Sequence, residues 1–263
     1  MSARALQPAS DSERSLIMTD EFLFISSPVN VLRGDAARAA LAATNDAAHY
    51  TEGKGVLSVP LERWQKAQAY ERETWLVHAI NSTDDRNLEH AAMFDGYKAL
   101  PEKLGDVIEL GCGPFTNLRL ILPERTAGVV TLLDPLASEY LTLHPNCAYK
   151  NRMLGDIWVN LVSWPIEAAD DPTIDMRDHR YDTVILINVL THCQDTQKVS
   201  DWINTHLKKG GYLVFAEPVR DIDPTQLYDV GHPISFNQDV IDAFLKPYKE
   251  KFRNGNYFIG VKK

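Results

Sequence analysis

Short apolar runs alternate with amphipathic stretches in the second part of the chain. Buried parallel strands appear as near-continuous apolar runs, and strands that alternate with helices are typical of a doubly wound α/β sheet. We therefore predict an α/β domain over residues 99–263. The apolar runs place strands at 106–110, 129–133, 159–163, 181–187 and 212–216, a short helix that ends before Pro123, and a longer helix over 195–208.

Glycine marks the expected end of two elements. Residues 208–211 read Lys-Lys-Gly-Gly, a typical helix C-terminus, so the long helix is expected to stop there. Asn254 and Gly255 separate two strand-like runs, 248–252 and 256–261. Asn-Gly between such runs is the strongest short-range hairpin signal. The sheet is therefore expected to close with an antiparallel hairpin.

The first hundred residues lack this alternation. Residues 1–18 are polar, have no apolar signal-peptide core, and are expected to form a disordered tail. Residues 19–98 are predicted to be a helical cap over the carboxyl edge of the sheet, where ligands bind in open α/β folds. Within the cap we expect helices at 36–48 and 60–80, the second opened by Pro60, and a loop over residues 49–59.

One face of the second cap helix has an unusual composition. Trp64, Gln68, Glu71 and Trp75 are spaced by four, three and four residues, so they share one side of a helix. Two indoles with an amide and a carboxylate suit the wall of a substrate pocket. The alternative is that both tryptophans pack on the sheet while the polar pair reaches solvent.

A glycine turn follows the first predicted strand. Gly111 and Gly113 permit positive φ and let a ligand approach the backbone. Asp134 ends the next strand, where a carboxylate in a β-α-β unit can accept hydrogen bonds from both hydroxyls of a ribose. These residues predict a nucleoside-cofactor site.

The residues around the turn narrow the choice of cofactor. A dinucleotide turn has a third small residue, whereas Phe115 follows Pro114 here. Glu109 would repel a pyrophosphate and attract a cationic ligand. The stretch resembles the first motif of class I S-adenosylmethionine-dependent methyltransferases, which usually have glycine at the position of Phe115. The resemblance covers residues 100–263 and implies S-adenosyl-L-methionine as the cofactor. It also implies a mostly parallel, Rossmann-like seven-stranded sheet of order 3-2-1-4-5-7-6 with a terminal hairpin.

The resemblance assigns further cofactor contacts. Leu136 would pack on the adenine, and an acid just past strand three would accept from its amino group. Glu167 is favoured for this role over Asp156. Asn188 begins the loop that passes the methionine tail. The expected cofactor-binding residues are Glu109, Gly111, Cys112, Gly113, Asp134, Pro135, Leu136, Glu167 and Asn188.

Two histidines are candidates for a general base, because imidazole titrates near neutrality. His192 lies in the loop after strand four, and His232 lies between strand five and the last helix. Glu217 ends strand five and is expected to line the substrate site with the helix face described above. A capping or packing role for His192, a surface turn for His232 and a capping role for Glu217 are the alternatives.

Composition restricts the partners. A net charge of −9 disfavours a nucleic-acid partner, which needs a basic footprint. No apolar run is long enough to span a membrane, and three cysteines at no metal-ligand spacing suit a reducing, cytoplasmic location without a metal site. We expect a small-molecule acceptor, methylated on oxygen, nitrogen or carbon. A protein or RNA methyltransferase, or a cofactor-binding protein without methyl transfer, stays open, as does the oligomeric state.

Overall fold

The computed structural model describes residues 31–33, 35, 36, 39, 49–51, 53–77, 86–170, 176, 178–220 and 227–263. The predicted tail at 1–18 and most of the predicted helix at 36–48 lie outside these residues.

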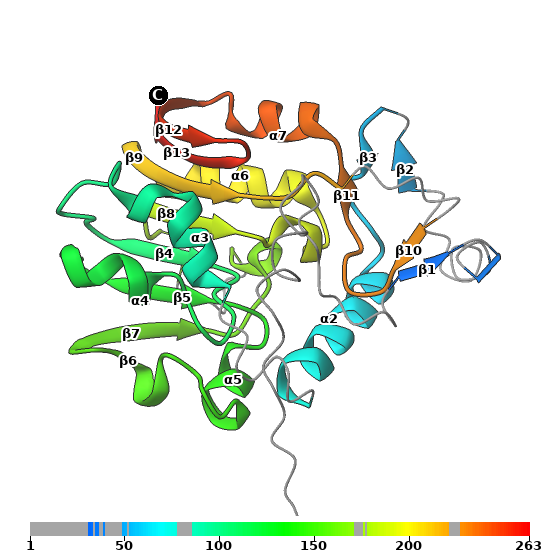
Figure 1. The fold of residues 1–263 in the computed structure, drawn as a ribbon, viewed down its shortest axis with the longest axis horizontal. Helices are drawn as coiled ribbons and strands as arrows, with labels where there is room; N and C mark the ends of the chain where they lie inside the picture. Colours follow the sequence, from blue (N-terminus) through cyan, green and yellow to red (C-terminus); the bar gives the residue numbers. More distant parts are fainter. Residues whose placement is uncertain are drawn as a thin grey trace, which may run out of the picture.

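An eight-stranded sheet forms the centre of the described part of the chain (Figure 1). Its order is β12-β13-β9-β8-β4-β5-β7-β6. The five strands from β9 to β7 are parallel, and β13 runs antiparallel to β9. The predicted order 3-2-1-4-5-7-6 is confirmed, with the short antiparallel β6 added at one edge. The strands are β4 (Val107–Leu110), β5 (Val130–Leu133), β6 (Met153–Leu154), β7 (Ile157–Val162), β8 (Tyr181–Ile187), β9 (Leu207–Ala216), β12 (Tyr248–Asn254) and β13 (Tyr257–Lys262).

Apolar side chains on both faces of the sheet hold the helices, because successive strand residues point to opposite sides. Ile108 and Leu110 belong to one core cluster with residues of α6 (Thr196–His206) and α7 (Gln238–Leu245). Val107 belongs to the other cluster, into which α4 (Leu118–Ile121) and α5 (Ala137–Leu143) pack, together with the end of α3 (Asn87–Met93). The domain is therefore doubly wound.

The cap contains strands as well as helices. Helix α2 (Leu61–Leu76) begins directly after Pro60, as predicted. The loop predicted over 49–59 is wrong, because β2 (Tyr50–Thr51) and β3 (Gly55–Val56) form a hairpin there. β3 pairs with β11 (Ser235–Phe236), and β1 (Val31–Arg33) pairs with β10 (Leu227–Asp229). These short strands are stabilised by partners far along the chain, which local pattern does not reveal.

The cap lies at the carboxyl edge of the sheet. In Figure 1, α2 is beside the ends toward which the arrows of the parallel strands point, close to β10 and β11. The segment between β9 and α7 therefore joins the amino-terminal segment over this edge.

The end of α6 and the start of β9 both lie earlier in the chain than predicted. Helix α6 stops at His206 and β9 begins at Leu207, so residues 208–211 are not a helix stop. The pairing of β9 with β8 shifts register there, and Gly210 has a φ of +79°. Residues that resemble a helix C-cap in sequence thus form a strand irregularity.

The terminal hairpin is confirmed, with its turn one residue later than predicted. Asn254 pairs with Tyr257, which leaves Gly255 and Asn256 as the turn. Gly255 has a φ of +57°, the backbone conformation for which glycine is favoured.

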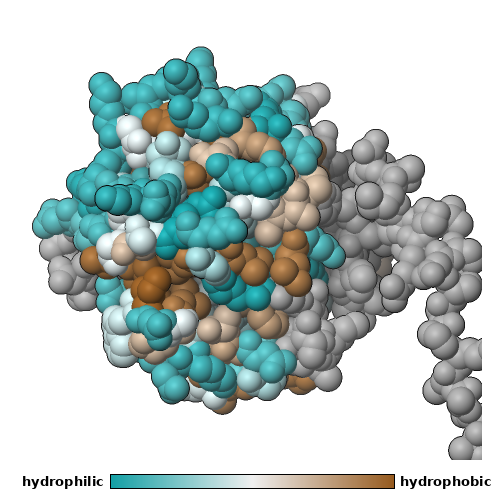
Figure 2. Space-filling view, turned by 60° about the vertical axis from the view of Figure 1, so that its left-hand side comes forward, coloured by the Kyte–Doolittle hydropathy of each residue, from teal (hydrophilic) through white to brown (hydrophobic). Residues whose placement is uncertain are grey.

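The surface turned forward in Figure 2 is hydrophilic over much of its area, with apolar side chains gathered near its middle. None of the helices in the described ranges has the length and apolar character needed to cross a membrane.

Candidate functional site

The glycine turn after β4 is closed on one side and open on the other. The amides of Gly111 and Cys112 donate to the carbonyl oxygen of Leu133, at 2.7 and 3.2 Å. Gly111 has a φ of +66°, and a Cβ there would lie 2.4 Å from a methyl group of Val189. Gly113 has a φ of +53°, and a Cβ there would meet nothing within 4 Å. Packing thus requires the first glycine, and the second exposes the backbone to a ligand.

Asp134 lies beside this open turn. Its carboxylate accepts from the amide of Gly113 at 3.0 Å and from the amide of Leu136 at 2.8 Å. The residue is buried, and burial raises the pKa of its carboxyl group to about 6. Each carboxylate oxygen has a second lone pair, so the group can hold the turn and still accept from two ligand hydroxyls. The open Gly113 and this carboxylate fit the ribose of a nucleoside cofactor.

Glu109 holds the turn from within. Its carboxylate accepts from the hydroxyl of Thr116, from the amide and side chain of Asn117 at 2.8 and 3.0 Å, and from the amide of Leu118 at 3.2 Å. The group is buried, and burial raises its pKa. Its oxygens therefore contact the loop that leads into α4.

Tyr149 supports the same turn and was not found from sequence. Its hydroxyl donates to the carbonyl oxygen of Gly113 at 2.9 Å, and the sulfur of the buried Cys112 lies 3.9 Å from that hydroxyl. Cys112 thus packs as a small side chain. Tyr149 is far along the chain from the turn and belongs to no local motif, so only the fold reveals the contact.

The predicted face of α2 meets the loop after β8. The indole of Trp64 and the amide of Gln68 both donate to the carbonyl oxygen of His192, at 3.1 and 3.2 Å. The indole of Trp75 donates to one oxygen of Glu71 at 3.1 Å, and the other oxygen lies 3.5 Å from Nδ1 of His192. These polar groups therefore join the cap to the loop, while the two tryptophans pack against the two cores.

His192 is held in one orientation. It ends the short helix η7 (Leu190–His192), and its Nδ1 lies 3.1 Å from the carbonyl oxygen of Gly231. A carbonyl only accepts, so Nδ1 carries the hydrogen, and Nε2 has the lone pair in the neutral ring. Burial, together with the nearby His232 and Arg220, lowers the pKa of His192 well below its usual value. The ring is therefore neutral at pH 7.

His232 uses both ring nitrogens in a buried network. Its Nδ1 lies 2.9 Å from a carboxylate oxygen of Asp229, and its Nε2 lies 3.1 Å from a guanidinium nitrogen of Arg220. The guanidinium also pairs with Asp229 at 2.9 Å. Arginine only donates, so Nε2 accepts and Nδ1 donates. The ring centroid lies 4.2 Å from that of His192, so the network supports the neighbouring ring.

Glu217 fixes the start of η7. One of its oxygens accepts from the amides of Val189 and Leu190, the latter at 2.5 Å. The residue is buried at the end of β9, and burial raises the pKa of its carboxyl group to about 7. Asn188, at the end of β8, has a φ of +56°, and its amide donates to the carbonyl oxygen of Ala216 at 2.7 Å. The loop of His192 is thus tied to the end of the neighbouring strand.

The two acids considered as acceptors for the adenine amino group lie at opposite ends of β7. Glu167 is in η6 (Ile166–Ala168), after β7, and accepts from the amides of Gln194 and Asp195 at 2.6 and 3.1 Å. Asp156 precedes β7 and is exposed. Only Glu167 therefore lies at the carboxyl edge, where the buried Leu136 and half-buried Pro135 follow β5.

A further contact joins the cap to residues 229–230, and the sequence did not predict it. The guanidinium of the buried Arg63 donates to the carbonyl oxygens of Asp229 and Val230, at 2.5 and 2.8 Å. The position of Arg63 next to Trp64 in the sequence does not indicate this contact. The contact between Asp229 and His232 could have been suspected, because the two residues are only three apart in the sequence. No group of side chains in the described ranges is arranged to hold a metal ion.

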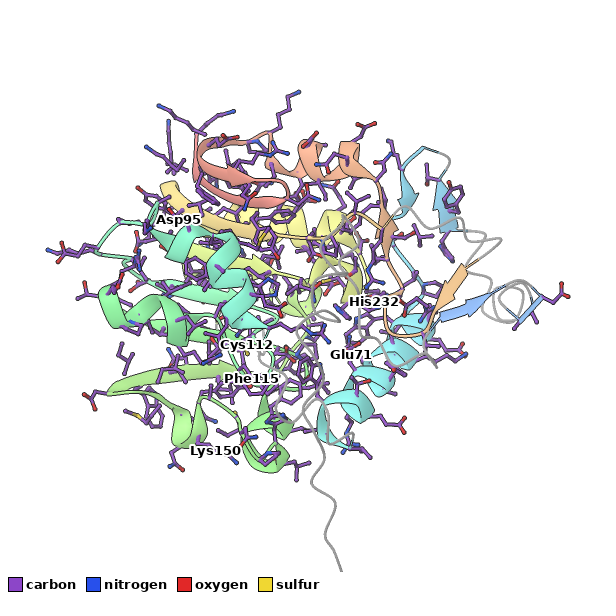
Figure 3. All side chains as sticks on the ribbon, viewed as in Figure 1. Glu71, Asp95, Cys112, Phe115, Lys150 and His232 are labelled. Atoms are coloured by element: carbon purple, nitrogen blue, oxygen red, sulfur yellow. The ribbon has the colours of Figure 1, made fainter. Side chains whose placement is uncertain are left out.

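The predicted residues come together at one edge of the sheet. Figure 3 shows Glu71 and His232 near α2, with Cys112 and Phe115 opposite them toward the middle of the fold, while Asp95 and Lys150 lie away from this region.

Comparisons with known proteins place the chain in a family. The family described as Methyltransferase domain matches residues 85–254. A search of curated proteins gives no match.

Solved structures resemble the fold at low identity. The N-methyltransferase NodS from Bradyrhizobium japonicum, solved with S-adenosyl-L-homocysteine, is 16% identical, covers 75% of this chain and 96% of its own, and has a TM-score of 0.48. A Burkholderia thailandensis 1,6-didemethyltoxoflavin-N1-methyltransferase is 15% identical, with coverages of 89% and 95% and a TM-score of 0.44. An O-methyltransferase family protein from the same organism is 15% identical, with coverages of 86% and 82% and a TM-score of 0.49.

The family match spans the glycine turn, the acid after β5 and most of the sheet. The chain belongs to the methyltransferase-domain family and is a class I S-adenosylmethionine-dependent methyltransferase.

Proposed function

We propose that this methyltransferase acts on a small-molecule acceptor held between α2 and the carboxyl edge of the sheet. The proposal rests on the hydrogen bonds that Trp64 and Gln68 donate to the carbonyl oxygen of His192, because these bonds hold the cap over that edge. An acceptor beneath such a cap must be small, whereas a folded protein or an RNA needs an open groove. The net charge of −9 also disfavours RNA.

We assign the cofactor to the turn and the loops beside it. Asp134 would accept from the ribose hydroxyls, and the backbone at Gly113 would lie against the ligand. Leu136, with Pro135, would pack on the adenine, and Glu167 would accept from its amino group. Asn188 would line the methionine tail with its backbone. Glu109, Gly111 and Cys112 shape the turn from behind.

When bound, S-adenosylmethionine supplies a methyl group activated by a sulfonium. The residues of this chain position the acceptor and exclude water, the main sources of rate in a direct displacement. Trp64, Gln68, Glu71, Trp75 and Glu217 form or support the acceptor side of the site.

We assign the general base to His192. Its Nδ1 donates to the carbonyl of Gly231, which leaves the Nε2 lone pair to take a proton from an acceptor hydroxyl. His232 is a weaker candidate, because Arg220 and Asp229 occupy both its nitrogens. An amine or an acidic carbon would need less help from a base, so the proposal favours an oxygen acceptor.

The test uses the full chain with S-adenosylmethionine tritiated in its methyl group. Parallel reactions contain a small-molecule cell extract, total RNA or heat-treated cell protein, and the fractions are separated before counting. Label should accumulate in the small-molecule fraction and fall by about 10²-fold or more in the His192→Gln variant.

Two results would overturn the proposal. Label found only in RNA or protein would support a macromolecular methyltransferase. Cofactor binding without transfer to any fraction would support a cofactor-binding protein. The exposed Glu73→Gln variant, which alters the outer face of α2, is the control and should retain activity.

A further inference from the structure

Glu71 lies on the side of His192 that faces away from Nε2. One of its oxygens is 3.5 Å from Nδ1, and the other accepts from the indole of Trp75 at 3.1 Å. Both partners are largely buried, with side chains 16% and 19% exposed for Glu71 and His192. The carboxyl group is therefore oriented by one neighbour and directed toward the histidine.

The spacing between the two residues is held by the elements that carry them. Trp64 and Gln68, on the same helix as Glu71, donate to the backbone carbonyl of His192. Helix α2 and the histidine loop are thus fastened together one to two turns from Glu71. These hydrogen bonds between the cap and the loop therefore fix the distance between Glu71 and His192.

Gly231 makes room for this arrangement. A Cβ there would lie 2.8 Å from the oxygen of Glu71 that approaches His192, and 3.1 Å from the ring of Tyr70. Its φ lies outside the left-handed region, so the backbone does not require glycine. The missing side chain instead admits the carboxyl group of Glu71 beside the histidine.

Building on the function proposed above, we propose that Glu71 is the positioning residue of His192. Its carboxylate lies beside the Nδ1–H that donates to Gly231, reinforces this orientation of the ring with Nε2 toward the acceptor, and stabilises the imidazolium formed when Nε2 takes a proton. The acceptor hydroxyl gives its proton to Nε2, and its oxygen uses the freed electron pair to bond the methyl carbon. The carbon–sulfur bond breaks with its electron pair on sulfur, and the histidine then releases the proton to solvent.

Burial is the main cause of the pH dependence of the pair, and the surrounding charges modify it. Burial raises the pKa of Glu71 to about 8, and burial lowers the pKa of His192, so the histidine is already neutral where the carboxylate forms. The stabilising carboxylate is present above about pH 8 and is lost as the pH falls. Trp75 donates to Glu71, and the charged or titratable groups that act on its carboxyl group are His192, Asp229, Arg86, Asp134, Arg220 and Tyr140. Those that act on His192 are His232, Arg220, Asp229, Glu71 and the carbonyl of Gly231.

The first test needs no acceptor. The full chain is labelled with ¹⁵N-histidine, the His192 signals are assigned with His192→Gln, and the ring nitrogen shifts are followed from pH 6 to 9.5. The wild-type ring should show an inflection near pH 8 from the ionisation of Glu71, and the Glu71→Gln variant should lose it. An inflection that persists in Glu71→Gln, or a wild-type ring without one, would overturn the proposal.

Two further variants separate this role from a general loss of structure. Glu73→Gln, the same change on the exposed side of α2, should keep the inflection. Gly231→Ala should move the end of the Glu71 side chain and shift or remove the inflection while Glu71 is retained. An inflection unchanged in Gly231→Ala would contradict the geometry.

Once an acceptor is known, kinetics give the second test. Glu71→Gln should lower kcat by about 10- to 100-fold and remove the rise in rate toward pH 8, with little change in cofactor Kd. A change confined to KM would assign Glu71 to acceptor binding and overturn the positioning role. The NMR titration does not depend on methyl transfer. It can therefore confirm the pairing of Glu71 with His192 even if the proposed acceptor class is wrong, and it can refute the pairing even if that class is right.

Discussion

The ring of Phe115 lies edge-on to the indole of Trp75, with ring centroids 6.2 Å apart and an interplanar angle of 69°. Phe115 stands where related turns usually have a third glycine, and Trp75 belongs to the cap helix. The phenyl ring also meets the imidazole of His144 at 5.3 Å. Phe115, the residue that departs from the family motif, therefore connects the turn to the cap helix of this chain.

This contact predicts an energetic coupling between the two rings. In a double-mutant cycle of Phe115→Leu and Trp75→Leu, the edge-on pair should give a coupling of about 0.5–1.5 kcal/mol in the free energy of unfolding. Urea denaturation of the four proteins measures it. Additive losses would show that the two rings do not stabilise each other.

The open side of Gly113 predicts a loss of binding larger than the loss of stability. Gly113→Ala and Gly210→Ala both place a side chain at positive φ with no atom within 4 Å of the new Cβ. Each should destabilise the fold by about 1–2 kcal/mol. Only Gly113→Ala should weaken binding of S-adenosylhomocysteine, as measured by calorimetry. Equal affinity in the two variants would remove Gly113 from the cofactor site.

The carboxylate of Asp134 predicts a pH-dependent cofactor affinity. Its pKa is about 6, and the ribose hydroxyls require the ionised form as acceptor. The affinity for S-adenosylhomocysteine should therefore fall about tenfold from pH 7 to pH 5. Asp134→Asn should bind weakly at both pH values, because the N–H₂ group that replaces one carboxylate oxygen cannot accept a hydrogen bond from a backbone amide or a ribose hydroxyl. The exposed Asp156→Asn is the control, and a flat wild-type profile would contradict the assignment.

The buried carboxyl group of Glu217 predicts a pH-dependent stability. Its pKa is raised from 4.5 to about 7, so the folded state binds the proton more tightly than the unfolded state. Stability from this group is present below about pH 4.5 and is lost as the pH rises to about 7. Relative to the wild type, Glu217→Gln should gain about 2–3 kcal/mol between pH 5 and pH 8.

Urea denaturation at the two pH values checks this prediction. The side-chain amide introduced by Glu217→Gln would keep an oxygen that accepts from the backbone amides of Val189 and Leu190, so the turn should survive the substitution. The exposed Glu250→Gln serves as the control and should show no such gain. A difference from the wild type that does not change with pH would contradict the raised pKa.

Much of the fold was predictable because it depends on local pattern. The runs that became β4, β5 and β8 are apolar on both faces, which a buried parallel strand requires. The glycines of the turn, Asp134 and the hairpin signal at Gly255 are likewise short-range features. The spacing of Trp64, Gln68, Glu71 and Trp75 correctly indicated a shared helix face, since helical periodicity is local.

Tertiary structure decided what depends on distant partners. The strands at 50–51 and 55–56 are stabilised by β11, which pairs with one of them. Residues 208–211 form an irregularity within β9, because Leu207 and Tyr212 on either side of them pair with β8. The two histidines looked equivalent in sequence, yet Arg220 occupies the lone pair of His232, while the carbonyl of Gly231 leaves that of His192 available. A side chain's protonation and tautomer follow from the groups that surround it in space, and only the folded chain brings those groups together.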